Sequence, residues 1–99
     1  MKYAPSIIYG HDEHTCWACK GNGGGKLDRH EVFHGPYRKK SAQLGLWVHL
    51  CHDKCHINGV HGDKKMLDDL LRITAEEAAL DHYGWTIQDF IREFGKNYI

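Results

Sequence analysis

The chain has 99 residues and no formal net charge, with 41% hydrophobic and 26% charged residues. This balance is typical of a folded globular domain and excludes a disordered or uniformly basic chain, and the length favours one domain. No apolar run approaches the roughly 20 residues that cross a bilayer, and the N-terminal region lacks the apolar stretch of a signal peptide, so we expect neither feature.

Charge is unevenly distributed along the chain. Residues 1–65 carry ten Lys or Arg against six Asp or Glu, which is +4, whereas residues 66–99 carry three against seven, which is −4. We therefore expect an anionic partner to contact the first two-thirds of the chain.

The first half of the chain predicts a hairpin. Residues 1–15 form an irregular lead-in, and residues 16–25 combine a tight turn with a glycine run that predicts a flexible connector. Successive side chains of residues 27–33 are expected to alternate between two faces, and the β-branched and aromatic content favours a strand. Residues 34–45 contain Gly, Pro and three consecutive cations and predict a loop. Residues 46–50 then predict a second, antiparallel strand.

From residue 63 the hydrophobic period becomes helical. Apolar residues recur at helical spacing over residues 63–83, and Gly84 is placed to end this amphipathic helix. Thr86 and Asp89 have the spacing of a capping box, which predicts a short second helix that ends at Gly95.

Four cysteines form two close pairs, Cys16-x2-Cys19 and Cys51-x3-Cys55. Without a secretion signal, such pairs indicate a metal site rather than disulfides, and four thiolates suit tetrahedral structural Zn²⁺. A knuckle, a hairpin and a helix that carries the second pair would together make a treble-clef finger. His56 is an alternative fourth ligand in place of Cys55, and four unliganded cysteines are the remaining alternative. In so small a chain, zinc is predicted to contribute directly to folding.

The sequence thus predicts one small α+β domain over residues 1–99. Its residues 16–62 supply the zinc knuckle, the hairpin and a segment rich in metal ligands, and residues 63–99 supply a C-terminal pair of helices. Three tryptophans are predicted to lie in the core, and five histidines are predicted to be ordinary surface or structural residues, with His52 exposed. These residues are Trp17, Trp47, Trp85, His11, His14, His49, His52 and His82.

Several short motifs in fixed order resemble small phage-encoded proteins of the HNH nuclease superfamily. They are residues 27–35 (LDRHEVFHG), 38–41 (RKKS), 45–48 (GLWV), 50–51 (LC), 59–61 (GVH) and 94–98 (FGKNY). The resemblance implies a ββα-metal fold, in which a hairpin and a helix hold one divalent cation against a scissile phosphate of DNA.

The resemblance assigns roles residue by residue. It places His30 at the metal-ligand position and Glu31 at the position of the general base, where many relatives have histidine. His56 matches the last histidine of the pattern, and His61 could add a third ligand. The asparagine of the HNH pattern has no counterpart before the second cysteine pair.

The identity of the base stays open at this level. A divalent cation (Mg²⁺, Mn²⁺, Ni²⁺ or Zn²⁺) would offset charge at the phosphate while a base deprotonates water. Glu31 could serve only if burial raised its pKa, because an adjacent cation lowers it, whereas imidazole suits neutral pH. Glu31 could instead bind the metal, with His34 as the base, or the site could bind without efficient cleavage.

The resemblance also implies partners and a location. Arg38, Lys39 and Lys40 are predicted to contact phosphates of double-stranded DNA, which makes binding fall with salt. An endonuclease of a phage or prophage would act in the host cytoplasm, as a homodimer or with a phage or host protein. The alternatives are a non-catalytic zinc finger that binds DNA or a protein, and a regulator that acts through protein contact alone.

Overall fold

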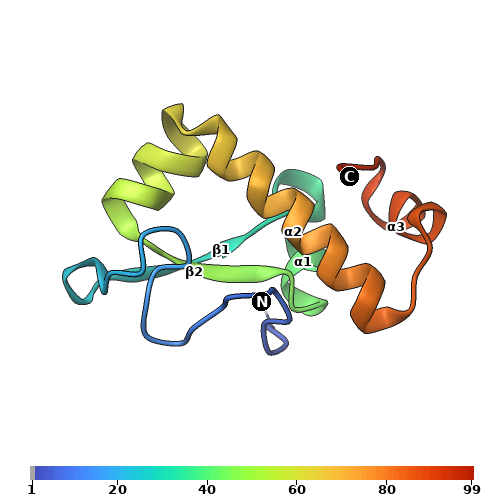
Figure 1. Ribbon diagram of the computed structural model, residues 1–99, viewed down its shortest axis with the longest axis horizontal. Helices are drawn as coiled ribbons and strands as arrows, with labels where there is room; N and C mark the ends of the chain where they lie inside the picture. Colours follow the sequence, from blue (N-terminus) through green and yellow to red (C-terminus); the bar gives the residue numbers. More distant parts are fainter. Residues whose placement is uncertain (1) are drawn as a thin grey trace.

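The computed structural model describes residues 2–99 as a small α+β fold built on a two-stranded antiparallel sheet (Figure 1). Strand β1 (Leu27–Glu31) pairs with β2 (Trp47–Cys51), so that Leu27 lies opposite Cys51 and Glu31 lies opposite Trp47. Both predicted strands and their antiparallel pairing are confirmed. The register brings the second cysteine pair to the same end of the hairpin as the start of β1.

The prediction of a loop over residues 34–45 is wrong for its second half, because residues there form the short helix α1 (Arg38–Gln43). Ser41 explains the difference, because its side chain is completely buried between the ends of the two strands. The Ser41 hydroxyl donates to the carbonyl of Leu46 at 2.6 Å and accepts from the backbone N–H of Phe33 at 3.2 Å. These two side-chain bonds to the strand ends stabilise a helix that the local Gly, Pro and charge content does not predict.

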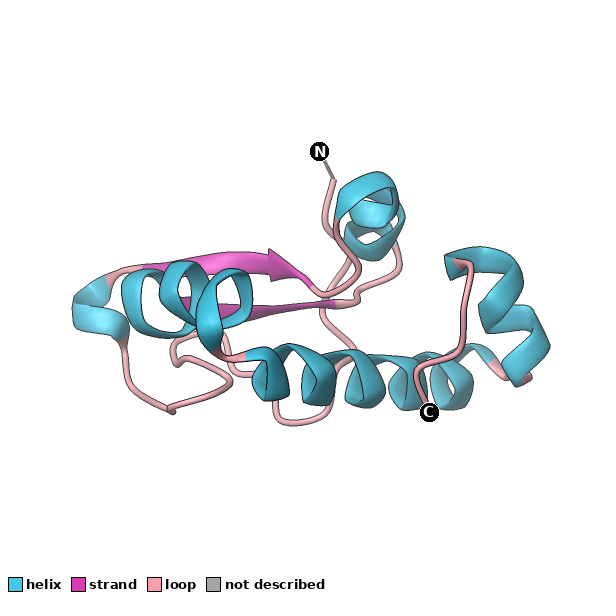
Figure 2. Ribbon diagram, turned by 90° about the horizontal axis from the view of Figure 1, so that it is seen from above, coloured by secondary structure: helices cyan, strands magenta, loops and turns pink. Residues whose placement is uncertain are grey.

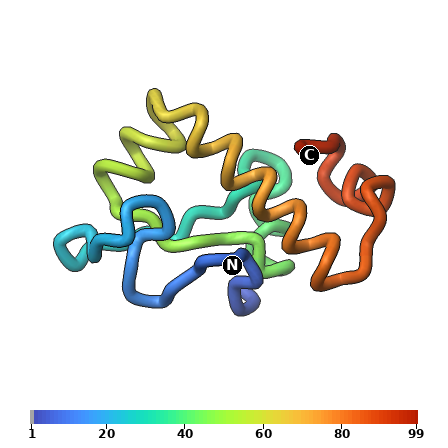
Figure 3. The backbone as a smooth tube through the Cα atoms, in the orientation of Figure 1, coloured from blue at the N-terminus to red at the C-terminus, as the bar shows by residue number. Residues whose placement is uncertain are grey.

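The glycine run also has more structure than the predicted connector. Gly23–Gly25 forms one 3₁₀ turn, and the side chain of Asn22 accepts from the N–H of Gly24 at 3.0 Å. Figure 3 shows this turn projecting from the end of the hairpin. All three glycines have positive φ, which glycine adopts readily, and the side-chain bond from Asn22 holds the turn in place.

Three helical segments follow β2. A wide, π-type helical segment, η3 (His52–Asp63), begins directly after the strand, and α2 (Lys65–Tyr83) and α3 (Ile87–Phe94) follow it. The predicted helix over residues 63–83 is confirmed, as is the capping box of Thr86 and Asp89. No helix within residues 2–99 is long and apolar enough to span a membrane.

Helix α2 covers one side of the hairpin and continues to α3 (Figure 2). The core lies between the hairpin and these two helices. Apolar side chains of all three form one buried cluster, which includes Val32, Leu46, Val48, Leu71, Ala75, Ala79, Phe90 and Phe94. Trp47 is also buried, while Trp17 and Trp85 pack at the margin of this cluster. The core therefore holds the hairpin, and with it the start of η3, in a defined position.

The N-terminal lead-in is tied to the turn that precedes β2. The N–H of Ile7 donates to the carbonyl of Gly45 at 2.9 Å, and Trp47 Nε1 donates to the carbonyl of Ala4 at 2.7 Å. Gly45 has φ +76°, and a Cβ atom at this position would overlap the carbonyl oxygen of Pro5. Glycine is thus required here for both backbone conformation and space.

Replacing Gly45 with alanine is expected to destabilise the protein by about 3 kcal/mol, which combines the left-handed conformation with displaced backbone hydrogen bonds. Gly84→Ala is the matched control, because Gly84 has φ +65° but no neighbouring atom within 4 Å of the added Cβ. The control is expected to cost about 1 kcal/mol. Urea unfolding measures both changes, and equal losses would show that the contact with Pro5 contributes nothing.

Candidate metal centres

The four cysteines gather into one cluster. A ligand atom from each of Cys16, Cys19, Cys51 and Cys55 lies within 4.8 Å of the others, and all four thiols are free. Tetrahedral zinc with Zn–S bonds of about 2.3 Å holds its sulfurs about 3.8 Å apart. The sulfurs of Cys19 and Cys51 are 4.0 Å apart, so this cluster could bind a metal such as zinc.

Backbone hydrogen bonds position the first cysteine pair. The N–H of Cys16 donates to the carbonyl of Gly21 at 2.7 Å, which closes the knuckle turn. The N–H of Cys19 points at the sulfur of Cys16 at 3.5 Å. The N–H of Trp17 donates to the carbonyl of His49 at 2.8 Å, which attaches the knuckle to the outer edge of β2.

The surroundings shift the pKa values of two of the thiols in opposite directions. Burial alone would raise the pKa of Cys16, but nearby backbone N–H groups outweigh it and lower the pKa to about 7. Burial and the neighbouring thiols raise the pKa of Cys55. One thiol is thus readily ionised and can start metal binding, which requires thiolates and releases protons from the others.

Three histidines form a second cluster, with ligand atoms of His30, His56 and His61 within 4.8 Å of one another. The ring centroid of His30 lies 5.2 Å from that of His56 and 5.1 Å from that of His61. His30 comes from β1, and the other two come from η3. Residues five apart point in different directions on an α-helix, but the wide winding of η3 places them on one side.

His30 lies at the closed end of this cluster. The residue is only 1% exposed, and its Nε2 has no hydrogen-bond partner within residues 2–99. Burial, reinforced by the nearby His56 and His61, lowers the pKa of His30 to about 3. The ring is therefore neutral, and a neutral imidazole with an unpartnered nitrogen fits a metal ligand.

Asp28 stands behind the histidine cluster and was not singled out in the sequence. Its Oδ2 lies 2.9 Å from Nδ1 of His56 and 2.5 Å from Nδ1 of His52. Although burial alone would raise the pKa of Asp28, its hydrogen bonds to His56 and His52 hold it below the usual value. A donating Nδ1 leaves Nε2 of His56 free to bind a metal. The available signal was that Asp28 shares a strand face with His30.

The expectation that His52 is exposed is wrong, because this residue is half-buried and bonded to Asp28. His14 and His82 are exposed, as predicted. His11 packs against Trp47 and His49, with ring centroids 5.0 and 5.3 Å apart. Within residues 2–99, His11, His14, His49 and His82 belong to neither candidate metal cluster.

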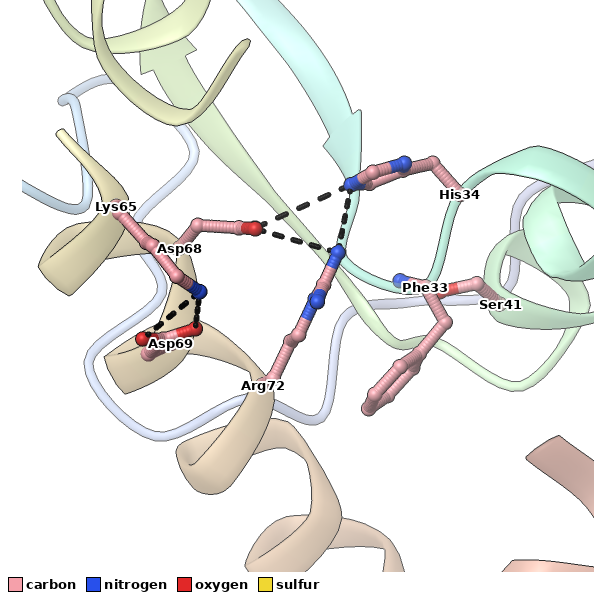
Figure 4. A network of polar contacts seen from close by, with 7 residues as sticks. All are labelled: Phe33, His34, Ser41, Lys65, Asp68, Asp69 and Arg72. Atoms are coloured by element: carbon pink, nitrogen blue, oxygen red, sulfur yellow. Dashed lines mark hydrogen bonds and ion pairs between the residues drawn. The ribbon is translucent and has the colours of Figure 1, made fainter. Parts of the chain in front are cut away.

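His34 lies beside the cluster and is part of a polar network (Figure 4). Its ring centroid is 5.2 Å from that of His61. Nη2 of Arg72 lies 3.1 Å from Nε2 of His34 and 3.2 Å from Oδ2 of Asp68. Arginine only donates, so Nε2 of His34 accepts. Oδ1 of Asp68 lies 4.0 Å from the same Nε2 and has no hydrogen-bond partner within residues 2–99.

Most of the remaining predicted residues are held by ion pairs. Oε1 of the buried Glu31 lies 2.6 Å from Nε of Arg38. Lys40 donates from Nζ to the carbonyl of Glu93 at 2.9 Å and lies 3.3 Å from its carboxylate. Lys39 is exposed on α1. Two of the three cations predicted to contact phosphate are therefore already paired with carboxylates.

One pocket of about 430 Å³ joins these groups. Its volume is within the range of pockets that bind small ligands. It contains all five residues predicted to be catalytic, together with two arginines and a glycine. The lining residues are Arg29, His30, Glu31, His34, Gly35, Arg38, His56 and His61.

Comparisons of the chain with protein-family models, with curated proteins and with solved structures gave no match. The chemistry of the site therefore rests on the residues and their geometry.

Proposed function

We propose that this protein is a metal-dependent, HNH-type endonuclease that hydrolyses phosphodiester bonds of double-stranded DNA. The observation that carries the proposal is the buried, unpartnered Nε2 of His30 beside two further imidazoles at a pocket lined by arginines. The hairpin followed directly by η3, with cysteines at the knuckle and at this junction, supports a treble clef with a ββα-metal core.

The histidine cluster would hold the catalytic cation. His30, His56 and His61 supply three nitrogen ligands, and Asp28 fixes the ring of His56 through its Nδ1. A bound divalent cation would offset phosphate charge and support the leaving oxygen. Nitrogen ligands suit Zn²⁺ and Ni²⁺ better than Mg²⁺, so transition metals are the favoured cofactors.

His34 is the better placed of the two candidate bases. Its side chain is 35% exposed, and Arg72 already contacts Asp68 as an alternative acceptor. When Arg72 turns fully to Asp68, Nε2 of His34 is free to take a proton from water. The new N–H then faces Oδ1 of Asp68, the buried oxygen without a partner. Glu31, by contrast, stays paired with Arg38 and holds that side chain at the pocket wall.

A non-catalytic zinc finger that binds DNA or a protein is the second candidate. One observation favours it: both base candidates are already engaged in this arrangement, because Nε2 of His34 accepts from Arg72 and the carboxylate of Glu31 is ion-paired with Arg38. The lack of an asparagine shortly before the second cysteine pair agrees with this alternative.

Incubation of the purified protein with supercoiled plasmid and Mg²⁺, Mn²⁺, Ni²⁺ or Zn²⁺ separates the candidates. The endonuclease is expected to convert the plasmid to nicked and linear forms with at least one of these cations. Salt-sensitive DNA binding without cleavage under any cation would select the non-catalytic finger. No DNA binding at all would leave only a protein partner.

The role of Asp28 gives a separate prediction. Asp28→Ala is expected to weaken divalent-cation binding at the histidine cluster by about 10- to 100-fold, because His56 loses its fixed orientation. Calorimetric titration of zinc-loaded protein with Ni²⁺ measures this change. Asp53→Ala is the matched control, since Asp53 is exposed and lies 3.8 Å from the other nitrogen of His52. Equal affinity of both variants would exclude a positioning role for Asp28.

A further inference from the structure

We propose that Arg29 binds a backbone phosphate of the DNA substrate at the pocket beside the histidine cluster. This inference rests on the proposed function and adds a contact that the run of cations in α1 does not supply. Neither the motifs nor the charge pattern distinguishes Arg29 from the other basic residues, whereas the tertiary structure does.

The pocket wraps around the open edge of β1. Three consecutive strand residues, Arg29, His30 and Glu31, line it, although successive side chains point to opposite faces of a sheet. Only a ligand at the strand edge can reach both faces, and the sheet has two strands, so β1 has an unpaired edge. A ligand there can contact the histidines on one face and Arg29 on the other.

The backbone of β1 also presents a donor at this edge. Val32 donates to the carbonyl of Leu46, and His52 donates to that of Lys26, so even-numbered residues bond across the hairpin. Antiparallel strands alternate between bonded and non-bonded pairs. The N–H of Arg29 therefore points outward, away from β2.

Aromatic rings, rather than a carboxylate, hold the guanidinium of Arg29. Its Cζ lies 4.7 Å from the ring centroid of Tyr3 and 5.3 Å from that of Trp47. The two rings meet edge to face at 5.5 Å, and Trp47 is itself buried. Within residues 2–99, no acidic side chain pairs with Arg29, in contrast to Arg38 with Glu31.

This arrangement suits a phosphodiester. Stacking on aromatic faces orients the guanidinium plane but does not use its N–H donors, which remain available for a bidentate contact with phosphate oxygens. The charge of Arg38 is already balanced by Glu31, and that of Lys40 by Glu93. Within residues 2–99, Arg29 is thus the pocket cation whose charge no carboxylate balances.

Equilibrium binding tests this inference without cleavage. Fluorescence anisotropy of a labelled DNA duplex, in the absence of added divalent cation, is measured over a series of salt concentrations. Arg29→Gln is expected to weaken binding about tenfold at low salt and to reduce the slope of log K against log salt by about one. Arg29→Lys keeps the charge and is expected to retain the slope while binding about threefold more weakly.

Arg92→Gln is the matched control, because Arg92 is an exposed arginine on α3 and its loss is expected to change neither value. Zinc content and circular dichroism verify that each variant is folded. Wild-type affinity or an unchanged salt slope in Arg29→Gln would overturn the inference and leave the proposed function standing. Failure of the wild type to bind the duplex at low salt would overturn both.

Discussion

Replacing Cys16 with serine is expected to leave the protein without a cooperative thermal transition. Zinc finger sites contribute about 10–16 kcal/mol of apparent binding energy, which is comparable with the whole stability of a domain, about 5–15 kcal/mol. Cys16 is fully buried between the knuckle and the end of the hairpin. Loss of this ligand therefore removes most of the free energy that holds these segments together.

Circular dichroism melting and zinc content per chain measure this effect. Lys54→Ala is the matched control, because Lys54 is exposed between Cys51 and Cys55 and its loss should change neither quantity. A strong chelator is expected to reproduce the effect of Cys16→Ser in the unaltered protein. A melting curve that survives zinc removal unchanged would contradict the structural role of the thiolate cluster.

Replacing His61 with alanine is expected to lower plasmid cleavage by more than about a hundredfold, since loss of a ligand should exceed the 10- to 100-fold cost of losing an outer-shell partner. His61 is an exposed residue, so its replacement opens no cavity. His30→Ala is expected to abolish cleavage as well, but it also removes a buried ring and tests stability at the same time.

His82→Ala is the control for both histidine variants, because His82 is exposed near the end of α2 and lies outside the pocket. The circular dichroism melting curve of His61→Ala should remain that of the wild type, which separates a damaged histidine cluster from a lost fold. Nicking at the wild-type rate by His61→Ala and His30→Ala would sink the assignment of the catalytic cation site.

The two candidate metal clusters share one short segment, residues 51–61. His52 follows Cys51 directly, His56 follows Cys55, and Asp28 bonds both histidines across the hairpin. A metal that fixes the cysteines would therefore also position His56, which belongs to the histidine cluster, and His52, which lies behind it. We therefore expect zinc loss to disorder the histidine cluster together with the fold.

Local patterns in the sequence were sufficient for much of the fold. Strand alternation located β1 and β2, helical periodicity located α2, and the capping box located the start of α3. The spacing of the cysteines was sufficient for their cluster, because each pair comes from one turn. These features depend on neighbours a few residues away, where backbone geometry limits the outcomes.

Other features depended on contacts that local patterns do not contain. Helix α1 forms because Ser41 bonds both strand ends. His56 and His61 share one side because η3 winds widely, and Asp28 lies behind them because of the strand face it occupies. The family resemblance named the three histidines, but their convergence is a property of the folded chain.

The amino-acid sequence by itself determined the α+β class, the paired thiols and the residues proposed to bind a second cation. Only the tertiary structure decided which cations remain unpaired and which imidazoles face one another. The reason is physical: an ion pair such as Arg38–Glu31, or the stacking of Arg29 on Tyr3 and Trp47, is selected by packing between segments far apart in the chain.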